Sequence, residues 1–347
     1  GPYYVDADHI GMGNVDLFVP SSDFFTLDVA DFTGRSAPDE YIDYFVKKYG
    51  GYAGDIEVPG WGNLSIGIED IRGAARKYLL AVKEAGRIYR HIEESKGRDG
   101  FVTEVSMDET DASQTPVELL FILAAVADEG IPAQTIAPKF TGRFNKGVDY
   151  EGDVHAFESE LRADLGVIEF AVREFGLPDN LKLSVHSGSD KFSIYGAIRS
   201  AIREREAGLH LKTAGTTWLE ELAGLALAGG EGLKTAAEIY ASALERIDEL
   251  CGPYAAVIDI ERSNLPDAST VAGWSGEQFA SALQHDQDSP DFNPDLRQLL
   301  HVAYKIAAEI GPRYLEMLDR FEDVIAANVE RNILERHLEK VFPSAAG

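Results

Sequence analysis

The chain has 347 residues, 45% of them hydrophobic, which is enough to bury a full core in one barrel-sized domain with insertions. Its 59 acidic residues exceed the 32 basic ones and give a formal net charge of −27, which argues against nucleic acid as a partner. No apolar run reaches the roughly 20 residues of a membrane span and no signal peptide is visible, so we expect no membrane partner. The one cysteine, Cys251, excludes an intramolecular disulfide and fits a reducing, cytoplasmic setting.

Strand-like and helix-like runs alternate along the chain, which favours an α/β fold with parallel strands. In chain order we expect a strand at 3–7, a loop-rich stretch at 16–36, helices at 39–49 and 68–97, a strand at 101–107, a helix at 113–130, a strand at 133–140, a helix at 153–176, a strand at 181–187, a helix at 192–208, and a strand at 209 that runs into a helix. Residues 232–341 are expected to be mostly helical with long loops. Because the chain begins inside an apparent strand, we expect that upstream sequence is missing.

At least five strand–helix units, each strand with polar residues at its C-terminal end, predict a (β/α)8 TIM-type barrel with helical C-terminal additions. We expect a single metal-dependent domain across residues 1–347, N-terminally truncated if upstream strands are lacking. The polar, proline-containing stretch 263–295 is interpreted as a lid or a surface insertion.

Four of the predicted strand ends carry groups that could do chemistry. They include three histidines and a set of carboxylates: Asp8, His9, Glu104, Asp108, Glu109, His186 and His210. Because the C-terminal ends of barrel strands converge, the three imidazoles and Glu104 could meet around one divalent ion. A lone histidine at a strand end is more often a hydrogen-bonded structural residue, but three at separate strand ends favour a shared metal site. His91, His155 and His337 lie in charged helical runs and are expected to be solvated.

Two further segments are candidates for binding an anionic substrate. Residues 139–147 bring three cations together in an acidic protein, Lys139 and Arg143 among them, although a solvated loop is as good an interpretation. Residues 186–191, His-Ser-Gly-Ser-Asp-Lys, form a small loop whose backbone N–H groups could face an anion, with Lys191 beside them. Such loops are also ordinary turns between a strand and a helix.

Four segments together resemble the tagaturonate epimerase family: VDADHIG, EVSMDETDASQTP, APKFTGRF and SVHSGSDKFSIYGAIR. The resemblance covers roughly residues 3–340, and HSGSDKFS is its most specific part. The Asp-His pair and the glutamate at a strand end are also similar to metal-dependent class II aldolases. The resemblance implies an isomerase of hexuronate catabolism that interconverts D-tagaturonate and D-fructuronate, or the related ketohexoses tagatose and fructose.

The chemistry of that reaction limits the mechanism. The inverted carbon lies β to the ketone, so simple enolisation cannot invert it. Retro-aldol cleavage with re-addition, or transient oxidation, would be needed. No GxGxxG lies in a strand–turn–helix context, so we expect no nicotinamide and favour the retro-aldol route.

The resemblance also implies roles for individual residues. His9, His186 and His210 would be metal ligands with Glu104 as a fourth, the ion being zinc first and manganese, nickel or cobalt as alternatives. Asp8, Glu104, Asp108 and Glu109 are the candidate catalytic carboxylates. Candidate substrate-binding residues are Lys139, Arg143, Ser187, Ser189, Lys191 and Lys212.

Two alternatives to the epimerase stay open at this point. One is a class II-type aldolase that releases its fragments, and the other is a non-catalytic carbohydrate-binding protein. In each case the expected partner is a small sugar acid, and the oligomeric state is open, a homo-oligomer included.

Overall fold

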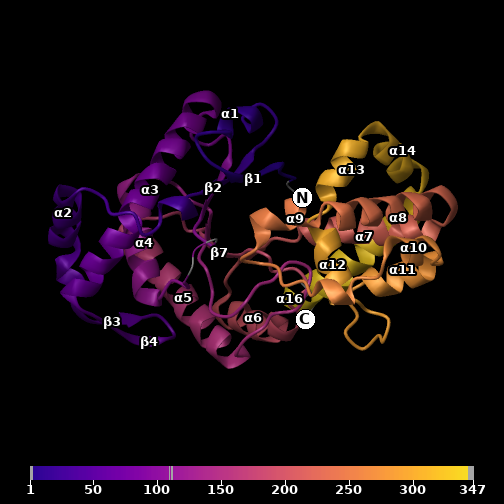
Figure 1. The fold of residues 1–347 in the computed structure, drawn as a ribbon. Coiled ribbons are helices and arrows are strands. Elements are labelled where there is room, and N and C mark those ends of the chain that lie inside the picture. The colour runs from indigo at the N-terminus through magenta and orange to yellow at the C-terminus, as the bar shows by residue number, and fades with distance from the viewer. Residues whose placement is uncertain (1–2, 109, 111, 343–347) are drawn as a thin grey trace. The chain divides into compact units, whose positions relative to one another are not determined.

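The computed structural model describes residues 3–108, 110 and 112–342, and the chain divides into two compact units (Figure 1). The first unit comprises Gly1–Thr141, His155–His186 and Ser200–His210. The second comprises Gly142–Val154, Ser187–Arg199 and Leu211–Gly347. The first unit contains the parallel sheet, and the second is built mostly from helices.

Six strands form the sheet, and their order in the sheet is their order in the chain. They are β1 (Asp6–Ile10), β2 (Phe24–Asp28), β5 (Val102–Ser106), β6 (Thr135–Ala137), β7 (Lys182–Val185) and β8 (Leu209–Leu211). Parallel pairing joins β1 to β2, β2 to β5, β5 to β6 and β6 to β7. The alternating pattern of the sequence therefore predicted the parallel sheet correctly.

The prediction of a closed (β/α)8 barrel is wrong. A barrel of this kind needs eight strands, whereas the sheet of the described residues has six and ends at β1 and β8. The error lay in extending the five predicted strand–helix units to the eight of a barrel, although the chain after β8 forms helices. The structure adds one strand to the five predicted ones, β2, which lies inside the stretch that we expected to be loop.

Helices pack against the parallel strands of the first unit. The principal ones are α3 (Ile68–Lys96), α4 (Pro116–Asp128) and α5 (Val154–Phe175), which in Figure 1 lie along one side of the strands, and α2 (Asp39–Tyr49) packs on α3. The short helix α1 (Val15–Phe18) follows β1, and α6 (Phe192–Arg205) follows β7. As predicted, α3 stops at Gly97, whose φ of 78° suits glycine better than any other residue.

An antiparallel hairpin that the sequence analysis did not predict lies between α2 and α3. It consists of β3 (Gly54–Val58) and β4 (Gly62–Ile66). Its turn packs closely on α5 at Gly166, where an added Cβ would lie 2.7 Å from the Pro59 carbonyl oxygen. Glycine at position 166 is therefore required by this close approach.

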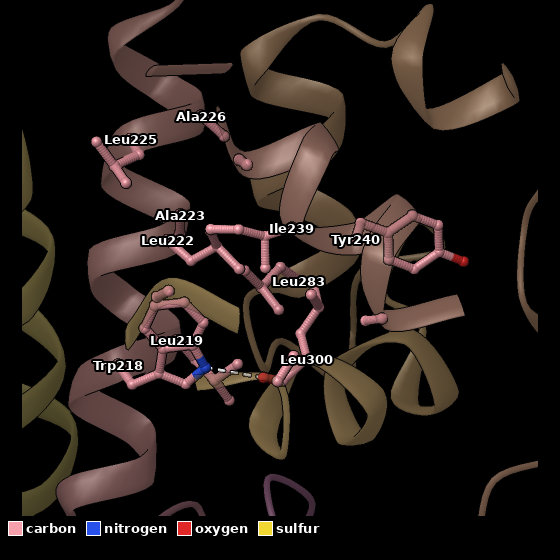
Figure 2. Packing of buried hydrophobic residues seen from close by; sticks show 14 of the residues in the cluster. Trp218, Leu219, Leu222, Ala223, Leu225, Ala226, Ile239, Tyr240, Leu283 and Leu300 are labelled. Atoms are coloured by element: carbon pink, nitrogen blue, oxygen red, sulfur yellow. Dashed lines mark hydrogen bonds between the residues drawn. The ribbon is translucent and has the colours of Figure 1, made fainter. Parts of the chain in front are cut away.

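The second unit has its own hydrophobic core. Its helices are α7 (Ala214–Ala228), α8 (Gly230–Glu245), α9 (Ile247–Cys251), α10 (Ala268–Ala272), α11 (Gly276–Leu283), α12 (Pro294–His301), α13 (Tyr304–Ile310), α14 (Pro312–Arg320), α15 (Glu322–Glu330) and α16 (Glu339–Val341). Figure 2 shows the side chains of α7, α8, α11 and α12 that meet in this core, where Trp218 Nε1 donates a hydrogen bond to the Leu300 carbonyl at 2.8 Å. The expectation of a mostly helical C-terminal part is confirmed.

The stretch 263–295 contains α10, α11 and the start of α12, so much of it is helical rather than loop. Its apolar residues Val271, Phe279 and Leu283 belong to the core of the second unit. A lid function for this stretch stays a prediction. Nowhere in the part of the chain that the structure describes is a helix long and apolar enough to cross a membrane.

Candidate active site

The C-terminal ends of β1 and β2 bring His9 next to Asp28. His9 has a φ of 52°, and the register of β1 against β2 shifts between Ala7 and Ile10. A local irregularity of this kind redirects a side chain that a regular strand would point elsewhere. The Nδ1 atom of His9 lies 3.3 Å from Asp28 Oδ2, while Asp28 Oδ1 accepts the backbone N–H of Ala30 at 3.0 Å.

Glu104 on β5 lies at the centre of the site and is fully buried. One of its oxygens, Oε1, lies 2.6 Å from His186 Nε2 and accepts a hydrogen bond from Thr26 at 3.2 Å. The other, Oε2, lies 2.8 Å from His210 Nδ1 and accepts a hydrogen bond from Thr135 at 2.7 Å. The strand register places the two threonine hydroxyls beside Glu104, because Thr26, Glu104 and Thr135 are direct neighbours across β2, β5 and β6.

His186 connects Glu104 to a second group of potential ligands. Its ring centroid lies 5.1 Å from that of His9, and its Nδ1 atom lies 3.0 Å from Asp108 Oδ1. This Nδ1 is buried and has no well-aligned hydrogen bond. One ligand atom from each of His9, Asp108 and His186 can be chosen so that all three lie within 4.8 Å of one another. Two imidazoles and a carboxylate at this spacing can hold a divalent metal ion.

The charges of the site are strongly coupled. Burial alone would lower the pKa of His186, but the Asp108 and Glu104 carboxylates outweigh it and raise the pKa to about 9. Conversely, burial alone would raise the pKa of Asp108, and the positive charge of His186 instead holds that pKa well below its usual range. The pKa of His9 is raised, because Asp28 and Asp8 together outweigh the effect of burial. The site therefore favours positive charge next to its carboxylates, which a metal ion would also supply.

Three other predicted residues of the first unit, Asp8, His210 and Lys139, are among the described residues. Asp8 is half-exposed, with Oδ1 at 3.6 Å from His9 Nε2. His210 contacts the Ser184 hydroxyl at 3.0 Å through its Nδ1 atom and does not belong to the group of His9, Asp108 and His186. The Lys139 ammonium donates to the Thr110 carbonyl. Glu109 lies outside the described residues.

The other predicted substrate-binding residues belong to the second unit. Lys191 is fully buried, and its ammonium donates to the carbonyls of Asn145 at 2.9 Å, Val148 at 2.6 Å and Ser189 at 3.1 Å. Burial lowers its pKa to about 8. In this structure Lys191 therefore fastens the loop after β6 to the loop after β7, and a contact with substrate stays a prediction.

Arg143, Ser187, Ser189 and Lys212 differ widely in exposure. Arg143 is about half exposed and pairs with Asp259 at 3.2 Å. Ser187 has a φ of 47° and is half-buried, Ser189 is buried, and Lys212 is half-buried. Their predicted contacts with substrate stay predictions.

A buried charge cluster lies next to Lys191 in the second unit. Asp190 accepts a hydrogen bond from Arg297 at 2.5 Å, and both side chains are fully buried. His337, which we expected to be solvated, is also fully buried: its Nδ1 lies 2.8 Å from the Asn332 carbonyl, and its Nε2 accepts the Asp190 backbone N–H at 2.9 Å. We expected exposure because the residues around His337 are charged. Its helical segment nevertheless presents one face to the interior, and His337 lies on that face.

The sequence analysis missed Asp28, Thr26 and Thr135. The sequence did contain a signal for Asp28. This carboxylate directly follows the apolar run Phe24–Leu27, just as polar residues follow the other strands of the site. The surrounding stretch was interpreted as loop, so the run was not recognised as β2. The threonines gave no local signal, because only the strand register places their hydroxyls on Glu104.

Two comparisons with known sequences point to the same protein family. A sequence profile described as tagaturonate epimerase matches residues 21–341. A tagaturonate/fructuronate epimerase from Thermotoga maritima is 30% identical over 277 residues, which are 78% of this chain and 51% of that protein. The chain thus spans about half the length of this curated relative.

Comparison with solved structures supports the fold. A glycerol complex of fructuronate-tagaturonate epimerase from Cohnella laeviribosi superposes with a TM-score of 0.76 at 23% identity, covering 98% of this chain and 68% of that one. The native structure of the same enzyme gives a TM-score of 0.73 at 24% identity, with the same coverage. At this identity the likeness establishes a shared fold.

Proposed function

This chain belongs to the tagaturonate epimerase family, and on that premise we propose that it interconverts D-tagaturonate and D-fructuronate with the help of a divalent metal ion. The observation that carries the proposal is the convergence of His9, Asp108 and His186 at the C-terminal ends of β1, β5 and β7. In an open parallel sheet, ligands bind at this edge.

The donor set suits a catalytic ion. Imidazole and carboxylate ligands fit zinc, manganese, nickel and cobalt, and three protein ligands leave a position for the substrate. His186 Nδ1, buried without an aligned hydrogen bond, is the kind of atom that an ion would satisfy. His9, His186 and Asp108 would hold the ion, and His210 remains a predicted further ligand. When bound, the ion would supply a Lewis acid for the substrate ketone.

The carbon that is inverted lies β to the ketone, so loss of its hydrogen is not assisted by that carbonyl. We infer a retro-aldol route, in which the bond between the α and β carbons breaks as the β-hydroxyl loses its proton. This leaves an enediolate and an aldehyde. The aldehyde then presents its other face, the same bond forms again, and the new alkoxide takes a proton back. The step needs no oxidant and no net gain or loss of protons.

Two proton-transfer groups are needed, because the hydroxyls before and after inversion point to opposite sides. Two of the predicted catalytic carboxylates, Asp8 and Asp108, lie next to His9 and His186, respectively. Asp8 is half-exposed and can accept a proton, whereas His186 holds the pKa of Asp108 well below its usual range, which suits a metal ligand better than a base. We assign Asp8 to one face of the substrate. Of the two residues predicted for the other face, Asp108 and Glu109, we favour Glu109, because it leaves Asp108 to hold the ion.

Incubation of D-tagaturonate with metal-loaded protein tests the proposal. We expect fructuronate to form, and a His186→Ala variant to lose at least 100-fold in kcat/KM with loss of bound metal, because it removes a ligand. His91→Ala is the matched control, since His91 lies on α3 and pairs with Asp16 at the surface. It should retain both activity and metal.

Other outcomes would redirect or reject the proposal. Three-carbon products in place of fructuronate would show an aldolase that releases its fragments. Turnover of tagatose alone would move the substrate to the neutral ketohexoses. Full activity and unchanged metal content in the His186→Ala variant would reject the proposed site.

A further inference from the structure

The three imidazoles of the site share a feature that the family assignment does not supply. Each has one ring nitrogen next to a carboxylate: His9 Nδ1 faces Asp28, while His186 Nε2 and His210 Nδ1 face the two oxygens of Glu104. The contacts are 3.3, 2.6 and 2.8 Å. The Glu104 carboxylate thus contacts two of the rings, and the Asp28 carboxylate contacts the third.

We propose that Asp28 and Glu104 are positioning residues, which orient these imidazoles and fix their tautomers for a metal ion. The inference rests on the metal site of the proposed function and assigns Glu104 a role other than ligand or catalyst. Asp28 then acts on His9, and Glu104 acts on His186 and His210. Neither carboxylate needs to touch the ion or the substrate.

The physical reason lies in the donors and acceptors of the rings. An ionised carboxylate can only accept, so the neutral imidazole beside it must carry its proton on the facing nitrogen. The opposite nitrogen then keeps its lone pair, and it is the lone pair that binds a metal ion. The nitrogens selected in this way are Nε2 of His9 and Nε2 of His210. In His186 both nitrogens face a carboxylate, and Glu104 holds Nε2 so that Nδ1 is left for the ion once Asp108 binds the same ion. His186 Nδ1 is the atom that the geometry already groups with His9 and Asp108.

The surroundings of the two carboxylates fit this role. Each Glu104 oxygen also accepts a hydroxyl, from Thr26 or from Thr135, so the carboxylate is held in one orientation. Asp28 is held by the backbone N–H of Ala30 through the oxygen that does not face His9. Glu104 is fully buried, and its carboxylate makes four contacts. It can therefore hold the two imidazoles in fixed orientations.

Cobalt(II) titration of metal-free protein, followed by its visible absorption and by competition with a chelator, tests the role of Asp28. We expect Asp28→Asn to weaken Co²⁺ binding about 10- to 100-fold, since the amide can donate where the carboxylate only accepts. Asp31→Asn is the control, because Asp31 is exposed and lies three residues further along the same segment. It should bind Co²⁺ as the wild type does. Equal affinity of Asp28→Asn and wild type would overturn the role of Asp28.

A second measurement does not need the metal. Imidazole ¹⁵N NMR spectra of the metal-free protein, under mildly alkaline conditions, report which ring nitrogen carries the proton. We expect the His9 ring to hold its proton on Nδ1 in the wild type and to become a mixture in Asp28→Asn. In Glu104→Gln the ring spectrum of at least one of His186 and His210 should change, because glutamine keeps only one acceptor oxygen. His210 would change tautomer, whereas His186, whose doubly protonated form Asp108 and Glu104 favour, would lose a proton more readily. Unchanged ring spectra in both variants would overturn the inference.

The two proposals can fail separately. A wild type that binds no Co²⁺ rejects the metal-dependent function, while the ring spectra still decide whether the carboxylates set the tautomers. A wild type that binds Co²⁺, with variants that bind equally well, rejects the positioning role alone. Rescue by Asp28→Glu of part of the lost affinity would support positioning by a carboxylate rather than a general loss of structure.

Discussion

His9 combines a functional side chain with an unfavourable backbone. Its φ of 52° lies in the left-handed region, which is reached at a cost of about 1–2 kcal/mol by residues other than glycine. The structure tolerates this where β1 loses its register with β2, beside Asp28. Strain kept at such a position is typical of functional sites.

This strain leads to a prediction about two variants that both lack the imidazole. We expect His9→Gly to be more stable than His9→Ala by about 1 kcal/mol, because only glycine adopts this φ without strain. The free energy of unfolding, measured with urea in metal-free buffer, gives the difference directly. At Asp8, whose φ is not positive, the order should reverse, with Asp8→Gly less stable than Asp8→Ala. If His9→Ala were at least as stable as His9→Gly, His9 would not be strained.

The start of α4 shows how a short sequence signal fixes an element. Thr115 Oγ1 accepts the Glu118 N–H at 3.2 Å, and Glu118 Oε2 accepts the Thr115 N–H at 2.8 Å, with Pro116 in the first turn. The helix leads away from β5, the strand that carries Glu104. The cap thus fixes where the chain turns after the site.

We expect Thr115→Ala to lower the free energy of unfolding by about 1 kcal/mol, because it leaves a helix N–H without its side-chain acceptor. Urea denaturation measures the loss. Thr115→Ser keeps the acceptor oxygen and should restore most of it. If the serine variant were as unstable as the alanine variant, the methyl group rather than the cap would be responsible.

At the scale of elements, the sequence was informative where the signal is local. The cap at Thr115, the glycine stop at Gly97 and the polar residues that end β5 and β7 are all encoded within a few neighbouring residues. The hairpin of β3 and β4 was missed, because its glycine turn lies in a stretch without clear alternation. The closure of the sheet was predicted wrongly, since the number of strands depends on which distant segments pair.

In the candidate site, too, local signals were predicted correctly and long-range contacts were not. His9, Glu104, Asp108, His186 and His210 were identified from their places at strand ends, and the structure brings their side chains into contact range. The roles of these residues were harder to predict from the sequence. That Glu104 lies between two imidazoles and two hydroxyls follows only from the register of three strands, which the sequence does not specify.

At the scale of the whole molecule, charge and ion pairing oppose each other. The formal net charge of −27 produces repulsion between the excess carboxylates. Exposed networks act in the other direction, and Arg246 with Glu249, Glu309 and Lys305 is an example. Exposed pairs of this kind contribute little, with a median of about 0–1 kcal/mol each. We therefore expect the repulsion to dominate.

This balance predicts how salt changes the melting temperature. Raising NaCl from about 10 mM to about 150 mM shortens the Debye length from about 30 Å to about 8 Å, which screens the repulsion over most of the surface. We expect Tm, followed by circular dichroism at constant pH, to rise by a few degrees. Sodium and potassium chloride should act equally at equal ionic strength, because screening depends on charge and not on the identity of the ion. A fall in Tm with salt would instead mean that the ion pairs stabilise the fold more than the surplus of acidic residues destabilises it.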